Sequence, residues 1–327
     1  MRWRVLRNKM IRILVTGGAG FIGSNVVAHL IELGYTVDIE DDFSSGSWRN
    51  IVKENALLVF DPDYEIYDVI VHLASTTDTS QDNQKMIIKN NVSHFQKVID
   101  YKKGLKKFYY HPLVIYASSA SVYGKRLLDS PAMKENDDLN PDTTYAFTKF
   151  HMEKLAEDEG RRYKGKVVGL RFFNVFGKNE RGKGKSASMI TQIYDQIEEN
   201  GIVKLFKGGR QMRDFVHVND VSYLITSIIF EHLKDKKKKF QPIYNVGSGE
   251  SISFNDLVKL IGKGRKFEPV IEYKNSIVPW FQDFTKADIN KAKEDFNWSP
   301  QFTLEERILK YIDSLKGQRV KNILNVT

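Results

Sequence analysis

The chain has 327 residues, 41% of them hydrophobic, which is enough for one large α/β unit or for two domains with separate cores. It contains no cysteine, which excludes disulfides, thiolate metal sites and a cysteine nucleophile, and we expect no metal centre. The formal net charge of +9 at pH 7 suits nucleic acid and phosphorylated small molecules equally, because both are polyanions.

Residues 1–10 are basic and have no apolar run of the kind that forms a signal peptide. We interpret them as a basic leader, with Met10 as an alternative start. No stretch approaches the roughly 20 apolar residues that span a bilayer. We therefore expect a cytoplasmic protein with no membrane partner.

From residue 11 onward the pattern predicts alternating strands and helices. Residues 11–16 are apolar on both faces, as in a buried parallel strand, and a helical pattern over residues 21–33 follows a glycine-rich turn. Further short strands are expected at residues 35–40, 57–60, 68–73, 113–117 and 167–171. This alternation predicts an α/β fold with a Rossmann-type, doubly wound parallel sheet whose ligands bind at the carboxyl ends of the strands.

Beyond residue 174 the rhythm changes. A loop rich in Gly and Lys (177–185) precedes a helix that ends at residue 200 and strands at 203–206 and 213–217, which together predict a smaller α/β substrate lobe. Residues 243–246 are strand-like and can return to the first sheet, so we expect the two domains to be interleaved. The predicted domains are residues 11–173 plus 214–249 for the dinucleotide and residues 174–213 plus 250–327 for the substrate.

The densest basic run, residues 234–239, has no aromatic residue among its lysines. It lies between a helical stretch and a strand. This favours a solvated loop over a nucleic-acid surface, and we expect no nucleic-acid partner.

The turn after the first strand places Gly17, Gly20 and Gly23 in a G-x-x-G-x-x-G spacing, with Phe21 and Ile22 opening the helix. Glycines permit a tight turn and close approach of a ligand, and the N–H groups of a helix N-terminus attract a pyrophosphate. The alternative is an ordinary glycine-rich turn. The strand before and the amphipathic helix after favour a dinucleotide site.

Acidic residues end the second strand at Glu40, Asp41 and Asp42, about 20 residues beyond the glycine-rich loop, where an acid can accept hydrogen bonds from the adenosine ribose. We choose Asp41 for this role and include Asp42 in the site; the alternative is a surface acidic turn. Carboxylates here repel a 2′-phosphate and favour NAD. Arg49 or Lys53 can fold back and favour NADP, so both cofactors stay open.

Tyr145 and Lys149 are four residues apart in an expected helix and therefore share one face. An ammonium nearby stabilises a phenolate, so Lys149 is expected to lower the tyrosine pKa and let Tyr145 exchange a proton with a hydroxyl. Ser118 and Ser119, at the end of a predicted strand, can hold the same substrate oxygen. The pair alone is common by chance, and its weight comes from the order of the motifs.

That order resembles the extended short-chain dehydrogenase/reductases that modify nucleotide sugars. The glycine-rich loop, Ser118-Ser119-Ala120-Ser121-Val122-Tyr123-Gly124 and Tyr145-x-x-x-Lys149 are followed by further similar motifs over about residues 11–312. These later motifs are Leu170-Arg171-Phe172-Phe173-Asn174-Val175-Phe176-Gly177, Arg213-Asp214-Phe215-Val216-His217-Val218-Asn219-Asp220-Val221 and Tyr244-Asn245-Val246-Gly247.

The resemblance implies an NAD(P)-dependent nucleotide-sugar epimerase and a homo-oligomer. Tyr145 is then the catalytic acid and base, Lys149 its partner and a ribose ligand, and Ser119 a catalytic and substrate-binding hydroxyl. Asn174 and Arg213 are expected to contact the sugar nucleotide, Arg213 through a phosphate; the alternative for Arg213 is an internal salt bridge. The remaining implied cofactor residues are Leu73, Ala74 and Asn91.

Within the family, Gly182-Lys183-Gly184-Lys185-Ser186-Ala187-Ser188-Met189 resembles the loop of ADP-heptose 6-epimerases. Lys204-Leu205-Phe206 and residues 280–288 do so too. The resemblance makes Lys183 a second catalytic base, with Lys185 or two solvent-exposed lysines as alternatives. Those enzymes generally favour NADP, whereas Asp41 and Asp42 in this chain favour NAD. The remaining implied substrate residues are Ser188, Gln192, Leu205, Phe206 and Phe281.

Other functions compete with this interpretation. A UDP-hexose 4-epimerase needs the Tyr, Lys and Ser but no second base, so Lys183 discriminates between the two. A 4,6-dehydratase is disfavoured because Ala120-Ser121 stand where that chemistry needs an acid. Another epimerase or a reductase stays possible, since pocket shape varies the outcome. A non-catalytic dinucleotide-binding protein is disfavoured by the intact Tyr145, Lys149 and Ser119.

Overall fold

The computed structural model describes residues 11–51, 56–76, 84–100, 112–162, 166–274 and 282–316. Its centre is a seven-stranded sheet in the order β11-β6-β5-β4-β1-β2-β3, in which every neighbouring pair is parallel. The predicted doubly wound α/β sheet is confirmed. The strands are β1 (Arg12–Thr16), β2 (Thr36–Glu40), β3 (Ala56–Leu58), β4 (Val69–His72), β5 (Leu113–Ser119), β6 (Val167–Phe172) and β11 (Ile243–Val246).

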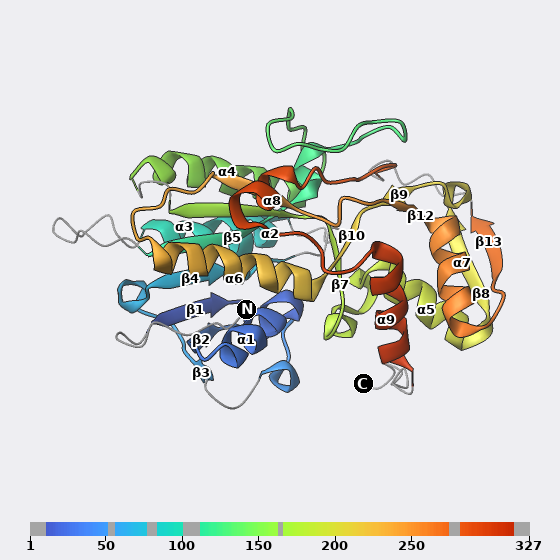
Figure 1. Ribbon diagram of the computed structural model, residues 1–327, viewed down its shortest axis with the longest axis horizontal. Helices are drawn as coiled ribbons and strands as arrows, with labels where there is room; N and C mark the ends of the chain where they lie inside the picture. Colours follow the sequence, from blue (N-terminus) through green and yellow to red (C-terminus); the bar gives the residue numbers. More distant parts are fainter. Residues whose placement is uncertain are drawn as a thin grey trace.

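Helices cover both faces of this sheet, which is why its central strands are apolar on both sides. One face carries α1 (Phe21–Glu32) and α6 (Val218–Lys234), and α8 (Asn290–Phe296) packs beside α6. The other face carries α3 (His94–Asp100) and α4 (Thr144–Arg162), with the short α2 (Gln84–Ile88) against α4. Figure 1 shows the resulting three layers.

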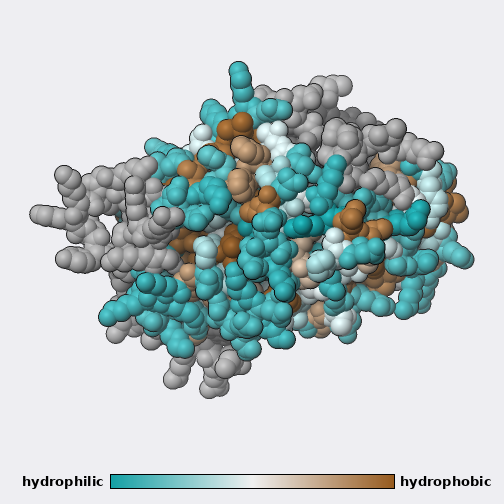
Figure 2. Space-filling view, turned by 90° about the horizontal axis from the view of Figure 1, so that it is seen from above, coloured by the Kyte–Doolittle hydropathy of each residue, from teal (hydrophilic) through white to brown (hydrophobic). Residues whose placement is uncertain are grey.

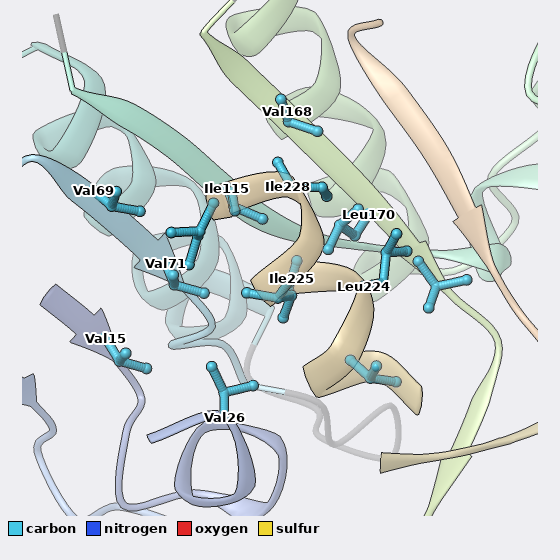
Figure 3. Packing of buried hydrophobic residues seen from close by; sticks show 14 of the residues in the cluster. Val15, Val26, Val69, Val71, Ile115, Val168, Leu170, Leu224, Ile225 and Ile228 are labelled. Carbon is cyan, nitrogen blue, oxygen red and sulfur yellow. The ribbon is translucent and has the colours of Figure 1, made fainter. Parts of the chain in front are cut away.

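The core beneath α6 explains how the sheet is stabilised. Figure 3 shows Leu224, Ile225 and Ile228 of α6 pointing at β-branched and leucine side chains of the strands, all of them fully buried. Burying one such side chain contributes about 1.5–3 kcal/mol. Their positions on α6 are spaced by one, three and four residues, so the helical pattern in the sequence matches the face that packs on the strands.

The substrate lobe lies at one end of the sheet, at the right of Figure 1. A second hydrophobic core forms between its helices and the parallel pair β8–β13. Two further strand pairs, β7–β10 and β9–β12, lie where the chain crosses between the two cores. The elements are β7 (Asn174–Phe176), α5 (Met189–Asn200), β8 (Ile202–Phe206), β9 (Met212–Arg213), β10 (Phe215–His217), β12 (Ile252–Ser253), α7 (Phe254–Arg265), β13 (Val270–Lys274) and α9 (Leu304–Leu315).

Short helical turns fill the connections and carry much of the candidate site. They are the 3₁₀ turns η1 (Trp48–Asn50), η2 (Tyr64–Ile66), η4 (Ala120–Tyr123), η5 (Glu180–Ser186) and η6 (Lys207–Gly209) and the π-helical turn η3 (Lys89–Ser93).

The structure differs from the prediction in two places. The single strand expected at residues 213–217 is two short strands in different sheets, because Asp214 between them turns its carboxylate into the lobe junction. Ala292 and Trp298, expected in the substrate domain, pack into the core under α6 instead. The interleaved return of residues 243–246 to the first sheet is confirmed, while the domain boundaries stay a prediction.

No helix in the described part of the chain is long and apolar enough to cross a membrane. The face seen in Figure 2 is mostly hydrophilic, with its hydrophobic residues in small groups. The basic run at residues 234–239 lies at the end of α6 and in the turn after it, as expected. The predicted leader, residues 1–10, lies outside the described residues.

Candidate active site

The glycine-rich loop forms a cradle in which Gly17 and Gly23 have no room for a side chain. Gly17 has a φ of +70°, and a Cβ on Gly23 would lie 2.0 Å from the Gly17 carbonyl oxygen. Helix α1 then begins at Phe21, with no side chain capping its N-terminus and no acidic residue in its first turn. Its first N–H groups are therefore left for a ligand, and this geometry fits the pyrophosphate of a dinucleotide. The predicted residues Gly17, Gly20, Phe21, Ile22 and Gly23 come together here.

The end of β2 shows which of the three acids belongs to this cradle. The Asp41 carboxylate accepts hydrogen bonds from the N–H of Ala19, 2.9 Å away, and the N–H of Phe43, 2.8 Å away. The Glu40 carboxylate instead accepts a hydrogen bond from the Tyr64 hydroxyl. Asp41 is thus held beside the glycine-rich loop, while Asp42 is exposed; their binding of the ribose stays a prediction.

Leu73 and Ala74 lie directly under the loop. The N–H of Leu73 continues the ladder to the Thr16 carbonyl at 3.0 Å, and the N–H of Ala74 donates to the Thr16 hydroxyl oxygen at 3.3 Å. A Cβ on Gly17 would come within 2.7 Å of the Ala74 nitrogen. The end of β4 therefore helps to shape the cradle.

Asn91, another predicted cofactor residue, is fully buried in the π-helical turn η3. Its Oδ1 accepts from the N–H of Thr76 at 2.8 Å, and its Nδ2 donates to the Thr148 hydroxyl at 3.0 Å. Asn91 thus joins the loop after β4 to helix α4, which carries Tyr145 and Lys149. π-helical turns occur frequently at functional sites.

Tyr145 lies in the first turn of α4 and hydrogen bonds to the side chain of Ser119, at the end of β5. Lys149 is buried one turn further on, with its Nζ donating to the Ala117 carbonyl at 2.9 Å and lying 5.7 Å from the centre of the Tyr145 ring. The structure therefore brings the predicted triad together from two elements.

The expected lowering of the tyrosine pKa by Lys149 is wrong for this structure. Burial raises the pKa of Tyr145, and the hydrogen bond from Ser119 only opposes this shift. Burial also lowers the pKa of Lys149 to about 7. Because the ammonium is itself desolvated, Lys149 is poised to exchange a proton near neutral pH rather than to act as a permanent cation.

Ser118, the neighbour of Ser119, has a different role. Its hydroxyl donates to Glu153, which also forms a bidentate ion pair with Arg171 at 2.9 and 2.8 Å. Arg171 donates further to the Tyr123 hydroxyl at 2.9 Å. This buried network ties β5, β6 and α4 together, and it leaves Ser119 as the serine that faces Tyr145.

Arg213 and Asn174 meet at the lobe junction. The Asn174 Nδ2 donates to the Asp214 carbonyl at 2.8 Å. The Arg213 guanidinium donates to the carbonyls of Met212 and Gln282, and burial lowers its pKa to about 10, opposed by the charge of Asp283. A desolvated guanidinium bonded to neutral oxygens is suited to an anionic ligand.

Gln282, which the sequence did not single out, connects this junction to the serine motif. Its Nε2 donates to the Gly124 carbonyl at 3.0 Å, directly after η4, while its own carbonyl accepts from Arg213. The contact brings the two halves of the site together. Only the proximity of Gln282 to the predicted residue Phe281 could have pointed to it; Phe281 lies outside the described residues.

Residues 177–188, which we call the lysine loop, bring Lys183 to the cofactor cradle. The Lys183 Nζ lies 5.8 Å from the centre of the Phe21 ring, and burial lowers the pKa of Lys183, opposed by the charge of Glu180. Ser188 ends the loop as the N-cap of α5 and donates its hydroxyl to Glu180. The side chain of Lys185 lies outside the described part.

The other predicted substrate residues are spread along α5 and β8. Gln192 donates its Nε2 to the Ala187 carbonyl at 2.7 Å. Leu205 packs in the second core, whereas the next residue, Phe206, is 36% exposed, because successive strand residues face opposite sides. Of the two, Phe206 has the side chain available to a ligand.

The protein resembles known epimerases over nearly its whole length. It is 29% identical to the ADP-L-glycero-D-manno-heptose-6-epimerase of Brachyspira hyodysenteriae, with 93% of this chain and 98% of that protein covered. It is 30% identical to the enzyme of the same name from Fusobacterium nucleatum, with 92% and 97% covered.

Solved structures agree. The ADP-L-glycero-D-manno-heptose-6-epimerase of Helicobacter pylori has a TM-score of 0.82 at 29% identity, covering 97% of this chain and 100% of that one. A UDP-glucose 4-epimerase of Thermotoga maritima, solved with UDP-glucose, has a TM-score of 0.82 at 27% identity, covering 94% and 99%. These similarities confirm the prediction of an NAD(P)-dependent nucleotide-sugar epimerase. Since the sequence model of the NAD dependent epimerase/dehydratase family matches residues 13–247, the chain belongs to that family.

Proposed function

We propose that the protein is an ADP-glycero-manno-heptose 6-epimerase that inverts the exocyclic carbon C6 with two proton-handling residues, Tyr145 and Lys183. The observation that carries this proposal is the placement of Lys183 against Phe21, the first residue of α1, which gives the site a second proton-handling group besides the Tyr145–Ser119 pair. The 29% and 30% identical relatives named as heptose 6-epimerases support the same sugar.

The residues divide the proton transfers between them. Bound NAD(P) supplies the hydride acceptor and donor. Lys183, whose pKa is lowered, takes the proton of the sugar hydroxyl as the carbon is oxidised. The transient sugar carbonyl then presents its opposite face, and Tyr145, whose pKa is raised, gives that oxygen a proton as the carbon is reduced, with Ser119 hydrogen bonding to the same oxygen. This inverts the centre with no net redox change, and proton exchange with solvent resets the two residues.

Burial of Lys183 supports this role. A lysine at its ordinary pKa stays charged and releases a proton poorly at neutral pH. Burial lowers the pKa of Lys183 below its ordinary value, which favours proton transfer by the amine. Arg213, which donates only to neutral oxygens in the bonds described above, would then hold the substrate diphosphate.

The experiment follows inversion at C6 of ADP-heptose by NMR, with mass spectrometry to exclude a change in mass. We expect Tyr145→Phe and Lys183→Ala each to lower kcat by about 10²–10⁴-fold. Lys178→Ala, in the same loop but ahead of the turn, is the matched control and should stay within about threefold.

The second candidate is a UDP-hexose 4-epimerase, favoured by the equal TM-score of the Thermotoga structure. Inversion at C4 of a UDP-hexose that survives Lys183→Ala would establish it and reject the heptose epimerase. The cofactor-bound protein should be used in both assays.

We further propose that NAD is the preferred cofactor. Asp41 is fixed by the N–H groups of Ala19 and Phe43 at the end of β2, where its charge would repel a 2′-phosphate. Arg49, one of the cations that could favour NADP, is exposed on η1, and Lys53 lies outside the described residues.

Binding of NAD and NADP by calorimetry tests this preference. Asp41→Asn should shift the ratio of the two Kd values toward NADP by about tenfold, while Asp63→Asn, on the exposed turn before η2, should leave it unchanged. Tighter binding of NADP by the unaltered protein would contradict the preference. We also propose that the protein is cytoplasmic and forms a homo-oligomer. Light scattering of the purified protein checks the oligomeric state, and fractionation of cells checks the location.

A further inference from the structure

The lysine loop is tied to the cofactor helix at its start. The Asn25 Nδ2 of α1 donates to the Lys178 carbonyl at 2.9 Å, and the Asn179 Nδ2 donates to the Ser24 hydroxyl oxygen at 2.9 Å. These bonds bring the loop to the N-terminal half of α1. They do not reach residues 182–184, which form the part of the loop that carries the amine.

The far side of the loop is held by Glu180, whose side chain is buried at 1% exposure. Its carboxylate accepts from the N–H of Ser188 at 3.1 Å and the hydroxyl of Ser188 at 3.0 Å, both at the start of α5. It also accepts from the hydroxyl of Thr191 on α5 and that of Tyr311 on α9, the latter at 2.8 Å. These hydrogen bonds tie the loop to α5 and α9.

The segment around Lys183 has little packing of its own. A Cβ at Gly182 or Gly184 would meet no atom within 4 Å, and Gly184 adopts a φ of +54° that interrupts the helical turn. The position of Lys183 therefore depends on the two anchors of the loop. Of these, Glu180 is the nearer in sequence, three residues before Lys183.

Glu180 also acts on Lys183 through its charge, since it opposes the effect of burial on the pKa of that amine. The first turn of α1 has no acidic residue, and on α5 the carboxylate of Asp195 is paired with Arg181 at 2.6 Å. The ring of His217, near Tyr311, has its pKa lowered to about 3 by burial and is neutral. Arg307 of α9 is paired with Asp220 at 3.0 Å.

We infer that Glu180 is the positioning residue of Lys183: its buried carboxylate fixes the lysine loop to α5 and α9, three residues before the amine, and places a negative charge in the same loop. This inference rests on the proposed function for its catalytic consequence. Its physical content, control of the Lys183 amine by Glu180, holds whatever the substrate is.

The test compares Glu180→Gln with Tyr311→Phe. The first keeps the size of the side chain but removes its charge, whereas the second removes one hydrogen bond to Glu180 and leaves the charge. Short acetylation pulses at pH 6–11 on the cofactor-bound full-length protein, read by peptide mass spectrometry, give the apparent pKa of Lys183. Thermal unfolding of each variant reports the loss of stability separately.

We expect Glu180→Gln to lower the apparent pKa of Lys183 by about one unit, because an opposite charge no longer favours the ammonium. Tyr311→Phe should lower the melting temperature but shift the pKa by less than about 0.3 units. Glu180→Asp, which keeps the charge, should leave the apparent pKa of Lys183 close to that of the parent protein. Equal pKa values in the parent and Glu180→Gln, or equal shifts in Glu180→Gln and Tyr311→Phe, would overturn the inference.

Activity separates this inference from the proposed function. If Lys183 is the second base, its ionisation shapes one limb of the plot of kcat against pH. That limb should move to lower pH in Glu180→Gln and stay in place in Tyr311→Phe. Full activity of Lys183→Ala would reject the two-base mechanism, yet the labelling result would still decide whether Glu180 controls the amine. A uniform loss of kcat in Glu180→Gln, with no movement of that limb or of the labelling pKa, leaves Glu180 as a structural residue only and rejects the inference.

Discussion

Lys149 shows what the burial of a cation costs at the scale of one residue. Its side chain is 1% exposed, and the partners of its Nζ are the Ala117 carbonyl and the Met152 sulfur, 2.9 and 3.9 Å away. Neither partner carries a charge. Burial therefore lowers the pKa of Lys149 to about 7, and each unit of that shift corresponds to about 1.4 kcal/mol of lost stability while the unfolded lysine is charged.

Replacing Lys149 by Met should therefore stabilise the protein while abolishing activity. The folded pKa lies below the ordinary value of 10.5, so the stability of the parent rises as pH increases from about 7 to 10.5. The gain from Lys149→Met should be largest at or below pH 7 and should shrink toward pH 10. Denaturant unfolding across this range measures it, with exposed Lys154→Met on the same helix as control. A difference that does not vary with pH would contradict the low pKa.

At the scale of one element, α1 is built around its glycines. Gly23 lies in the first turn of the helix, where it packs against the carbonyl of Gly17 in the turn before it. The close approach lets the helix N-terminus and the loop form one surface for a pyrophosphate. This requirement acts on the backbone, so it is visible in the sequence as a spacing of glycines.

Gly23→Ala should weaken dinucleotide binding by at least about tenfold, because its Cβ would lie 2.0 Å from the Gly17 oxygen and the backbone must shift. Calorimetric titration with NAD measures the loss. Gly182→Ala is the matched control, since a Cβ there meets nothing within 4 Å, and its Kd should stay within about twofold. Unchanged binding by Gly23→Ala would show that the cradle is more adaptable than its geometry indicates.

At the scale of the whole molecule, Asp214 joins the two lobes. This fully buried carboxylate accepts from the N–H of Ser248 at 2.6 Å, Gly249 at 3.0 Å and Ala287 at 2.9 Å. Burial raises its pKa to about 6, against these hydrogen bonds. Three separate stretches of chain meet at this single side chain, next to Arg213 and Asn174.

Asp214→Ala should lower the free energy of unfolding by about 3 kcal/mol or more, since it leaves three buried N–H groups without an acceptor. It should also raise KM, because the same junction places Arg213. Urea unfolding and steady-state kinetics measure the two effects. Asp63→Ala, which removes a carboxylate that accepts from the N–H of Glu65 on an exposed turn, should cost no more than about 1 kcal/mol. Similar losses in the two variants would reject the junction role.

The sequence by itself determined the elements whose signal is local. Strands such as residues 11–16 are apolar on both faces, which made the doubly wound sheet predictable. The helical periodicity and the glycine spacing at α1 predicted the cradle. The spacing of four residues predicted that Tyr145 and Lys149 share one face of a helix. The sequence also placed Asp41 at the end of the second strand, where its carboxylate accepts from the N–H of Ala19 in the glycine-rich loop; its role toward the cofactor stays a prediction.

Only the tertiary structure decided what depends on contacts between distant segments. It distinguished Ser119 from Ser118, which hydrogen bonds to Glu153. It placed Glu180, Asp214 and Gln282 where separate segments of the chain meet. It also gave Lys149 a low pKa, where the sequence had predicted a low pKa for Tyr145. Burial and hydrogen-bond partners set these properties. They arise when segments up to 158 residues apart come together, and no local pattern records them.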